Sequence, residues 1–152
     1  MKRALVLFLV TTTVIAISLA YSLSRSETKP AVIAASEVLT WDCEYPETKP
    51  ESIMITCGDG GMYVDRIEWS SWEATGAHGT GFYNVNDCDP DCADGKMHKA
   101  RVKVELSGLT IVQGKNFLRT MEIQTLDGKN LPESSQSHYI WDVMEFEEMM
   151  NK

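Results

Sequence analysis

Residues 53–69, IMITCGDGGMYVDRIEW, decide the fold class of this chain. Apolar side chains recur two residues apart on both sides of the glycine-rich stretch Gly58–Gly61. Period-two alternation is typical of half-buried strands, and glycine supplies the positive φ that tight turns need. The segment therefore predicts two strands joined by a turn, with Tyr63, Ile67 and Trp69 on one face of the second strand.

The same alternation returns later in the chain. Residues 101–106 alternate charged and apolar side chains, and residues 117–124 repeat the pattern. A further strand is predicted over residues 81–86, with Phe82 and Tyr83 on opposite faces. Several short strands separated by turns are typical of a small antiparallel sandwich or a partly open barrel, so we expect an all-β domain.

The last residues of the chain change period. Ile140, Val143, Phe146 and Met150 are spaced three or four apart, with glutamates between them. This spacing predicts a short C-terminal helix with an apolar stripe. We expect the stripe to pack against the sheet, with peptide docking or a membrane surface as the alternatives.

The N-terminal segment predicts export. Two basic residues, Lys2 and Arg3, precede an uncharged run that continues to Leu23. With small residues at Ser18 and Ala20, residues 1–23 fit a cleaved signal peptide. The run is also long enough to stay as a membrane anchor. The protein is then secreted, or it is anchored to the outer face of the cytoplasmic membrane.

Residues 24–38 are rich in serine and alanine and predict a flexible linker, which leaves residues 39–152 as one β domain. The net charge is −8, and loss of the N-terminal segment would remove basic residues and no acidic one. An acidic surface repels phosphate, so nucleic acid is excluded as a partner and contact with a membrane is expected only through the N-terminal segment.

Four cysteines, Cys43, Cys57, Cys88 and Cys92, follow the export segment and predict two disulfides. Chain entropy favours long loops: Cys88 with Cys92 closes about five residues for roughly 2 kcal/mol, whereas Cys57 with Cys92 closes about 36 for roughly 4 kcal/mol. We therefore expect Cys57 to pair with Cys88 or Cys92, and Cys43 to pair with the other. Zinc held by Cys88 and Cys92 is disfavoured because an oxidising compartment opposes free thiolates, and no cofactor is predicted.

Residues 55–95, ITCGDGGMYVDRIEWSSWEATGAHGTGFYNVNDCDPDCADG, carry a resemblance to a family. The stretch resembles a group of uncharacterised exported actinobacterial proteins that share TCADG, then W..W, A.GTG.Y and N.C.P.CA.G. This chain departs from the pattern at Gly58, Asp89 and Asp91. The resemblance implies export and a small β domain, and it implies no activity.

Two groups of residues suggest binding sites. Trp69 and Trp72, with Tyr83, are candidates for an exposed aromatic platform that binds a glycan or peptide, although tryptophans at such positions are more often part of the core. A run of alternating carboxylates before Gly95 suggests a weak calcium loop, but Cys92 stands where an EF-hand needs glycine. The four carboxylates are Asp87, Asp89, Asp91 and Asp94.

No established catalytic motif is present, so no catalytic residue is assigned. We expect an exported binding module of the cell envelope or extracellular space, whose partner is an envelope protein, a peptide or a glycan. The alternative is a small secreted hydrolase or metal-dependent enzyme that uses His78, His98 and nearby aspartates. That enzyme is excluded if the two histidines lie more than about 10 Å from each other and from every carboxylate.

Overall fold

The computed structural model describes residues 33–43 and 45–150. The predicted signal peptide or membrane anchor, residues 1–23, lies outside the described residues, as does the predicted linker as far as Val32. The chain from Ile33 onward forms one compact unit. Within its described part, no helix has the length and hydrophobicity that crossing a membrane requires.

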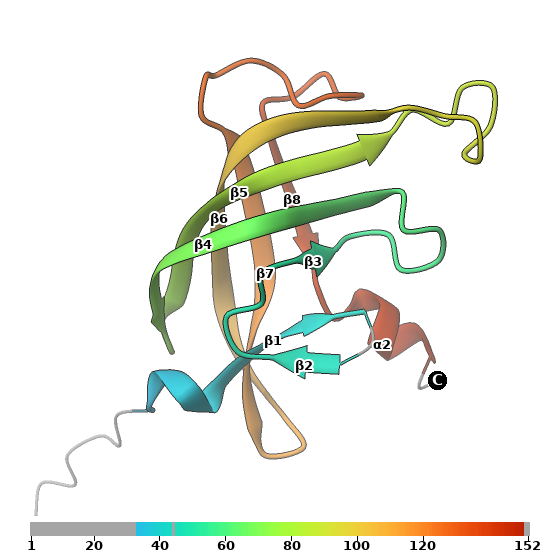
Figure 1. Ribbon diagram of the computed structural model, residues 1–152. Helices are drawn as coiled ribbons and strands as arrows, with labels where there is room; N and C mark the ends of the chain where they lie inside the picture. Colours follow the sequence, from blue (N-terminus) through green and yellow to red (C-terminus); the bar gives the residue numbers. More distant parts are fainter. Residues whose placement is uncertain (1–32, 44, 151–152) are drawn as a thin grey trace, which may run out of the picture. The chain divides into compact units, whose positions relative to one another are not determined.

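The described residues form one curled sheet of eight strands with a short helix at the C-terminal end (Figure 1). The strand order across the sheet is β2-β1-β7-β6-β5-β4-β3, and β8 also pairs with β7. This arrangement confirms the predicted all-β class with a C-terminal helix. The elements are η1 (Ala35–Glu37), β1 (Val38–Asp42), β2 (Tyr45–Glu47), β3 (Ile53–Met54), β4 (Met62–Glu73), β5 (Gly76–Asn86), β6 (Met97–Val112), β7 (Lys115–Thr125), β8 (His138–Asp142) and α2 (Glu145–Met150).

The sheet curls into a half-barrel, so the partly open barrel is the one of the two predicted architectures that the structure shows. Its wall is made of β4, β5, β6 and β7, which are long and antiparallel. β1 and β8 share the other edge of β7: β1 pairs with Asn116 and Phe117, and β8 pairs with residues 120–124. The β1–β7 pair is parallel, which corrects the expectation of antiparallel pairing throughout.

Two register shifts interrupt the alternation of β4, one between Asp65 and Glu68 and one between Trp69 and Ser71. Arg66 takes a positive φ of 51° at the first shift. A β-bulge adds a residue on one strand and changes which face the following side chains take. Val64 and Ile67 are therefore both buried, and the prediction that Tyr63 shares a face with Ile67 is wrong.

β5 begins earlier than predicted, at Gly76, and includes His78. Phe82 and Tyr83 take opposite faces, as expected: Tyr83 is buried, whereas Phe82 lies beneath the Arg66 guanidinium on the outer face. A Cβ at Gly79 would lie 2.8 Å from the Glu68 carbonyl oxygen. Glycine at this position therefore allows β4 and β5 to approach closely.

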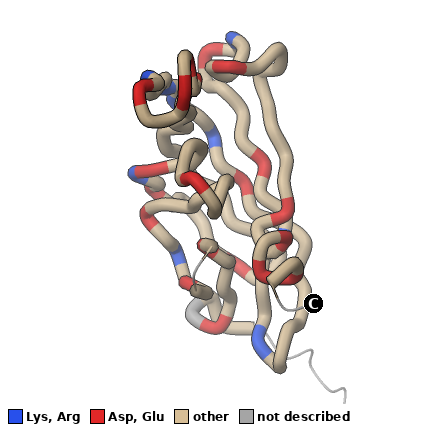
Figure 2. The backbone as a smooth tube through the Cα atoms, turned by 90° about the vertical axis from the view of Figure 1, so that its right-hand side faces the viewer, with Lys and Arg blue, Asp and Glu red and all other residues tan. Residues whose placement is uncertain are grey.

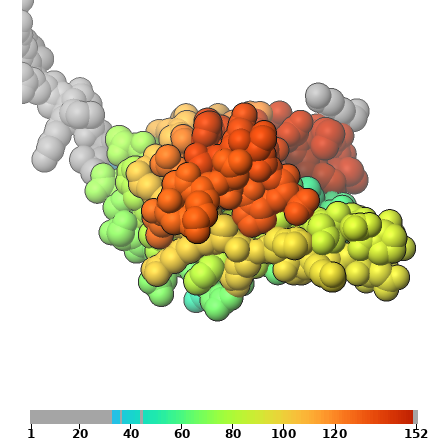
Figure 3. Space-filling view, turned by 90° about the horizontal axis from the view of Figure 1, so that it is seen from above, coloured from blue at the N-terminus to red at the C-terminus, as the bar shows by residue number. Residues whose placement is uncertain are grey.

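The core fills the concave side of the half-barrel. Its largest fully buried side chains come mainly from β6 and β7, including Leu106, Met121 and Ile123. The segment after β7, residues 126–137, covers one end of the sheet, and it is the orange surface at the centre of Figure 3. Leu131 of this segment is buried, so the segment belongs to the core as well as to the surface.

Both ends of the domain differ from the prediction. β1 begins at Val38, the last residue of the predicted linker, and residues 35–37 form a single 3-10 turn. The predicted helix begins only at Glu145, because residues 138–142 form β8. Ile140 therefore belongs to a strand and not to the helical stripe that its spacing suggested.

The predicted number of disulfides is confirmed, but the predicted pairing is wrong. Cys43 is bonded to Cys57 and Cys88 is bonded to Cys92. Cys88 and Cys92 close a loop between β5 and β6, whereas Cys43 and Cys57 join the segments that follow β1 and β3. The sheet brings Cys43 and Cys57 together, whereas Cys88 and Cys92 are neighbours within one loop, so strand placement and not the entropy of loop closure decides the pairing.

Candidate functional site

A groove runs along the open side of the half-barrel, where β3 and the start of β4 face β8 and α2. Two hollows of about 260 and 370 Å³ adjoin each other, because Met54, Cys57 and Phe146 line both. We call them together the apolar groove. Its further lining residues are Ile55, Thr56, Met62, Tyr139, Trp141, Asp142, Val143, Glu145 and Met149 in one hollow, and Asp42, Cys43, Tyr45 and Gly60 in the other.

The helix that forms one wall of the apolar groove is held by Arg119 of β7. The Arg119 Nε lies 2.6 Å from Asp142 Oδ2, and its Nη1 lies 2.6 Å from Glu148 Oε1. The hydrogen bonds with Glu148 and Asp142 raise the pKa of Arg119, so the guanidinium stays charged. Asp142 also accepts a hydrogen bond from the Met144 amide, which turns the chain from β8 into α2.

The opposite wall is held by the Cys43–Cys57 disulfide and by one hydrogen bond. The Met54 amide donates to Asp42 Oδ1 at 2.8 Å, which ties β3 to the end of β1. Residues from both edges of the sheet are therefore joined beside the groove. One wall of the groove is thus held by a disulfide and the other by the Arg119 contacts, and walls that are held in place lower the entropic cost of binding.

Both apolar and acidic side chains line the groove. Met54, Trp141 and Phe146 are among the apolar ones, and Asp42, Asp142 and Glu145 are the acidic ones. Figure 2 shows further acidic positions along α2, near the end marked C. A ligand with apolar side chains next to basic ones would match this combination.

One polar group of a groove-lining residue is unpaired. The Trp141 indole N–H is buried and has no hydrogen-bond acceptor among the described residues, and the same holds for the Trp41 N–H. A buried donor without a partner costs stability.

The predicted aromatic platform does not form, because Trp72 and Tyr83 are each only 4% exposed. Trp69 and Trp72 pack edge to face, with ring centroids 4.8 Å apart. The Trp72 Nε1 donates to the Val38 carbonyl and the Trp69 Nε1 donates to the Pro50 carbonyl. These two tryptophans belong to the core and its rim, which is the alternative that the sequence left open.

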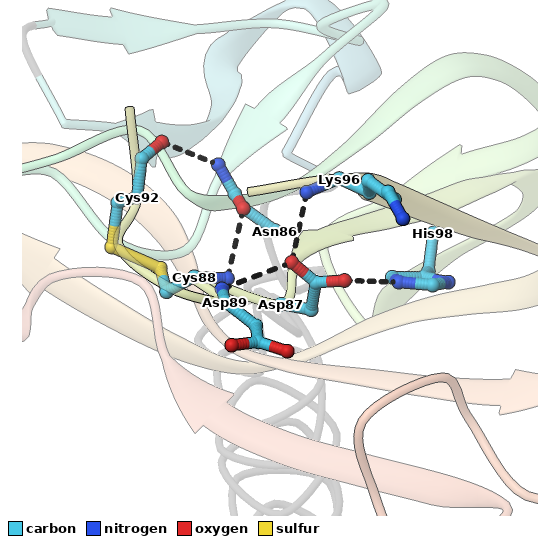
Figure 4. Close-up of polar contacts among 7 residues, drawn as sticks. All are labelled: Asn86, Asp87, Cys88, Asp89, Cys92, Lys96 and His98. Atoms are coloured by element: carbon cyan, nitrogen blue, oxygen red, sulfur yellow. Dashed lines mark hydrogen bonds and ion pairs between the residues drawn. A yellow bond between two sulfur atoms is a disulfide. The ribbon is translucent and has the colours of Figure 1, made fainter. Parts of the chain in front are cut away.

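The predicted calcium loop is organised by its own backbone (Figure 4). Asp87 accepts hydrogen bonds from the amides of Asp89 and Lys96, and its Oδ2 lies 2.8 Å from His98 Nε2. Asp91 accepts from the amides of the two residues that follow Cys92. The loop is therefore an acidic turn in which these carboxylates bond the chain.

Asp87 and Asp91 thus have backbone partners, whereas Asp89 and Asp94 accept no hydrogen bond from another described residue. The hydrogen bond with His98, followed by those from the Lys96 and Asp89 amides, lowers the pKa of Asp87 to about 2. Within residues 33–43 and 45–150, no three His, Cys, Asp or Glu side chains lie close enough together to hold a metal ion.

His78 and His98 do not share a site. His78 pairs with Glu105 across β5 and β6, seven positions along β6 from His98. At about 3.3 Å per residue, this separation is roughly 20 Å. Each histidine contacts a different carboxylate, Glu105 for His78 and Asp87 for His98. The structure therefore separates the two histidines of the hydrolase alternative, although each lies next to a carboxylate.

Sequence reasoning missed the apolar groove. Its walls come from residues 42–62 and 139–149, which lie side by side only in the folded chain. A weak signal was present in the sequence. The C-terminal segment carries the large apolar residues Trp141, Phe146 and Met149, although the chain as a whole is acidic. The sequence predicts that the C-terminal apolar stripe packs against the sheet, with peptide docking as an alternative, and it locates no groove.

Comparison of the chain with family models, with curated proteins and with solved structures gives no match. The function must therefore be argued from the groove itself.

Proposed function

We propose that this protein is an exported binding module, and that the apolar groove binds a segment of a partner protein. The partner segment carries apolar side chains flanked by lysine or arginine. The observation that carries the proposal is the apolar groove, in which Asp42 and Glu145 lie among apolar lining residues. Small apolar clefts with a few polar groups are typical binding sites.

Export is supported by the two disulfides, since such bonds form and persist in oxidising compartments. It is also supported by the N-terminal sequence, in which basic residues precede an uncharged run. The partner would then be an envelope or extracellular protein. Nucleic acid is disfavoured by the acidic charge of the chain.

Peptide binding by the exported protein tests the proposal. The protein is recovered after export, and peptides of alternating leucine and lysine are titrated while the tryptophan emission is followed, with leucine–glutamate peptides as the charge control. We expect saturable binding of the basic peptide only, because acidic side chains line the groove.

Met149→Lys is the groove variant for this titration, and Met97→Lys is its matched control. Both methionines are exposed, at 58% and 48%, but only Met149 lines the groove. Met149→Lys should weaken binding by about ten-fold, which corresponds to about 1.4 kcal/mol, and Met97→Lys should not. Equal affinities of the two variants, or tight binding of the leucine–glutamate peptide, would contradict the proposal.

A further inference from the structure

The outer edge of β8 is an unprotected edge of the sheet. Native sheets protect their edges with proline, lysine, bulges or very short strands. β2, at the end of the strand order, is three residues long and contains Pro46, and β3 at the other end is two residues long. β8 has five residues, HYIWD, without proline or lysine, and pairs only with β7 among the described strands.

The hydrogen bonds around β8 show which of its backbone groups face outward. The Val143 amide donates to the Arg119 carbonyl, and the Thr125 amide donates to the Ser137 carbonyl. In an antiparallel pair the bonded positions alternate, so Tyr139 and Trp141 direct their backbone groups toward β7. The amides and carbonyls of His138, Ile140 and Asp142 therefore point away from the sheet.

Apolar side chains accompany this edge. Ile140 is 53% exposed and Tyr139 is 42% exposed. Tyr139 and Trp141 have ring centroids 5.6 Å apart and both line the apolar groove. An exposed strand edge with an apolar residue at its centre is a surface for strand addition.

We infer that the outer edge of β8 pairs with the same edge of a second copy of this chain, which joins two half-barrels into one continuous sheet. Antiparallel pairing about a two-fold axis at Ile140 satisfies the outward backbone groups of both copies. It sets Ile140 against Ile140 of the partner subunit, and Tyr139 against Trp141 of the partner subunit.

The charges of β8 also complement each other in this register. His138 then lies opposite Asp142 of the partner subunit, and the two-fold axis repeats the pair. Asp142 remains one-third exposed at its side chain although it is bonded to Arg119. An exposed pair of this kind adds little affinity, so it defines the register while Ile140 and the backbone bonds hold the pair.

The expected association is weak, because two five-residue strands bury less than a standard interface of about 1,600 Å². Sedimentation of the exported protein from about 1 μM to 1 mM should show a reversible monomer–dimer equilibrium. Ile140→Lys should weaken the dimer by about ten-fold or more, because it places like charges opposite each other. Ile111→Lys is the matched control, since Ile111 is exposed at 69% on another strand.

A second measurement reports the register. Opposed residues of a hydrogen-bonded antiparallel pair have Cα atoms about 5.5 Å apart, which a disulfide can span. On mild oxidation, Ile140→Cys should form covalent dimers about ten-fold faster than Ile111→Cys, because pairing raises the effective concentration of the thiol.

Several outcomes would overturn the inference. A monomer at every concentration, a dimer that survives Ile140→Lys, or equal oxidation rates for the two cysteine variants would each do so. Protection of the Ile140 amide from exchange only after another protein is added would assign the edge to a different partner. The inference does not rest on the proposed function, since peptide binding by a monomer and dimerisation without peptide binding are separate results.

Discussion

The two disulfides should contribute unequally to stability, and removing each in turn tests the account of how the half-barrel is held. The Cys43–Cys57 bond spans 14 positions and the Cys88–Cys92 bond spans 4. In the chain-entropy model, closed loops of about 15 and about five residues correspond to about 3 and about 2 kcal/mol of stability.

The structure indicates a larger difference in stability between the two disulfides than loop length alone gives. The Cys88–Cys92 loop keeps the Asp87 and Asn86 hydrogen bonds to its backbone when the sulfurs are absent, so about 2 kcal/mol is an upper value for its loss. The Cys43–Cys57 bond joins segments from opposite edges of the sheet, beside the single hydrogen bond from Met54 to Asp42. Its loss should also loosen the groove wall.

Urea unfolding of the exported protein measures both effects. At a slope of about 2 kcal/mol/M, the double variant Cys43→Ser/Cys57→Ser should lower the midpoint by roughly 1.5 M, and Cys88→Ser/Cys92→Ser by roughly 1 M or less. A larger loss of stability from the second variant than from the first would refute the reasoning. The Cys88–Cys92 bond would then stabilise the fold more than the Cys43–Cys57 bond does.

Three further predictions test the packing and the acidic loop. Trp72→Phe removes the hydrogen bond to the Val38 carbonyl inside the core, and should lower the free energy of unfolding by about 2 kcal/mol in urea titration; a loss below about 0.5 kcal/mol would contradict this. Gly79→Ala should cost about 1–3 kcal/mol because its Cβ meets backbone, whereas Gly58→Ala, with open space around it, should change stability by less than about 0.5 kcal/mol; similar losses would argue against close strand approach. The hydrogen bond with His98 lowers the pKa of Asp87 to about 2, below the ordinary value of an aspartate. The ionised Asp87 carboxylate therefore stabilises the folded loop above about pH 4, and this stabilisation is lost as the pH falls toward 2. Amide exchange in the acidic loop, corrected for intrinsic rates, should therefore accelerate in that pH window, and a flat profile would count against the assignment.

The long strands were predictable because their signal is local. β6 and β7 alternate apolar and polar side chains over residues 102–106 and 117–124, so period two identifies them without tertiary information. β4 was predicted as a strand, but its faces were not. The positive φ of Arg66 accompanies the shift in register, and no residue pattern predicts a positive φ at this non-glycine residue.

The short edge strands were not predictable for a physical reason. β8 contains Ile140, which also fits a helical spacing with Val143 and Phe146, and only pairing with β7 decides between the two. The prediction of the disulfide pairing was wrong for a similar reason. Chain entropy compares unfolded states, whereas the parallel β1–β7 pair positions Cys43 in the native state, and a parallel contact leaves no local signature.

The apolar groove also required the fold, because its walls come from distant parts of the chain. Met54 and Cys57 meet Trp141 and Phe146 only after the sheet has curled. Composition indicated binding in general, since catalytic motifs were absent and the domain was small. The place of the proposed binding site was accessible only through the topology.

The Cys43–Cys57 bond also determines how the domain bears mechanical load. Tension on the N-terminal side of the chain enters at Val38, the first residue of β1, and β1 ends at Asp42. Once Val38 and Leu39 separate from β7 and residues 40–42 separate from β2, the pull reaches Cys43 and passes through a covalent bond to the segment that follows β3. A pull at this end could thus extend the protein by the length of one short strand. Further extension then requires the remaining strands to unfold together.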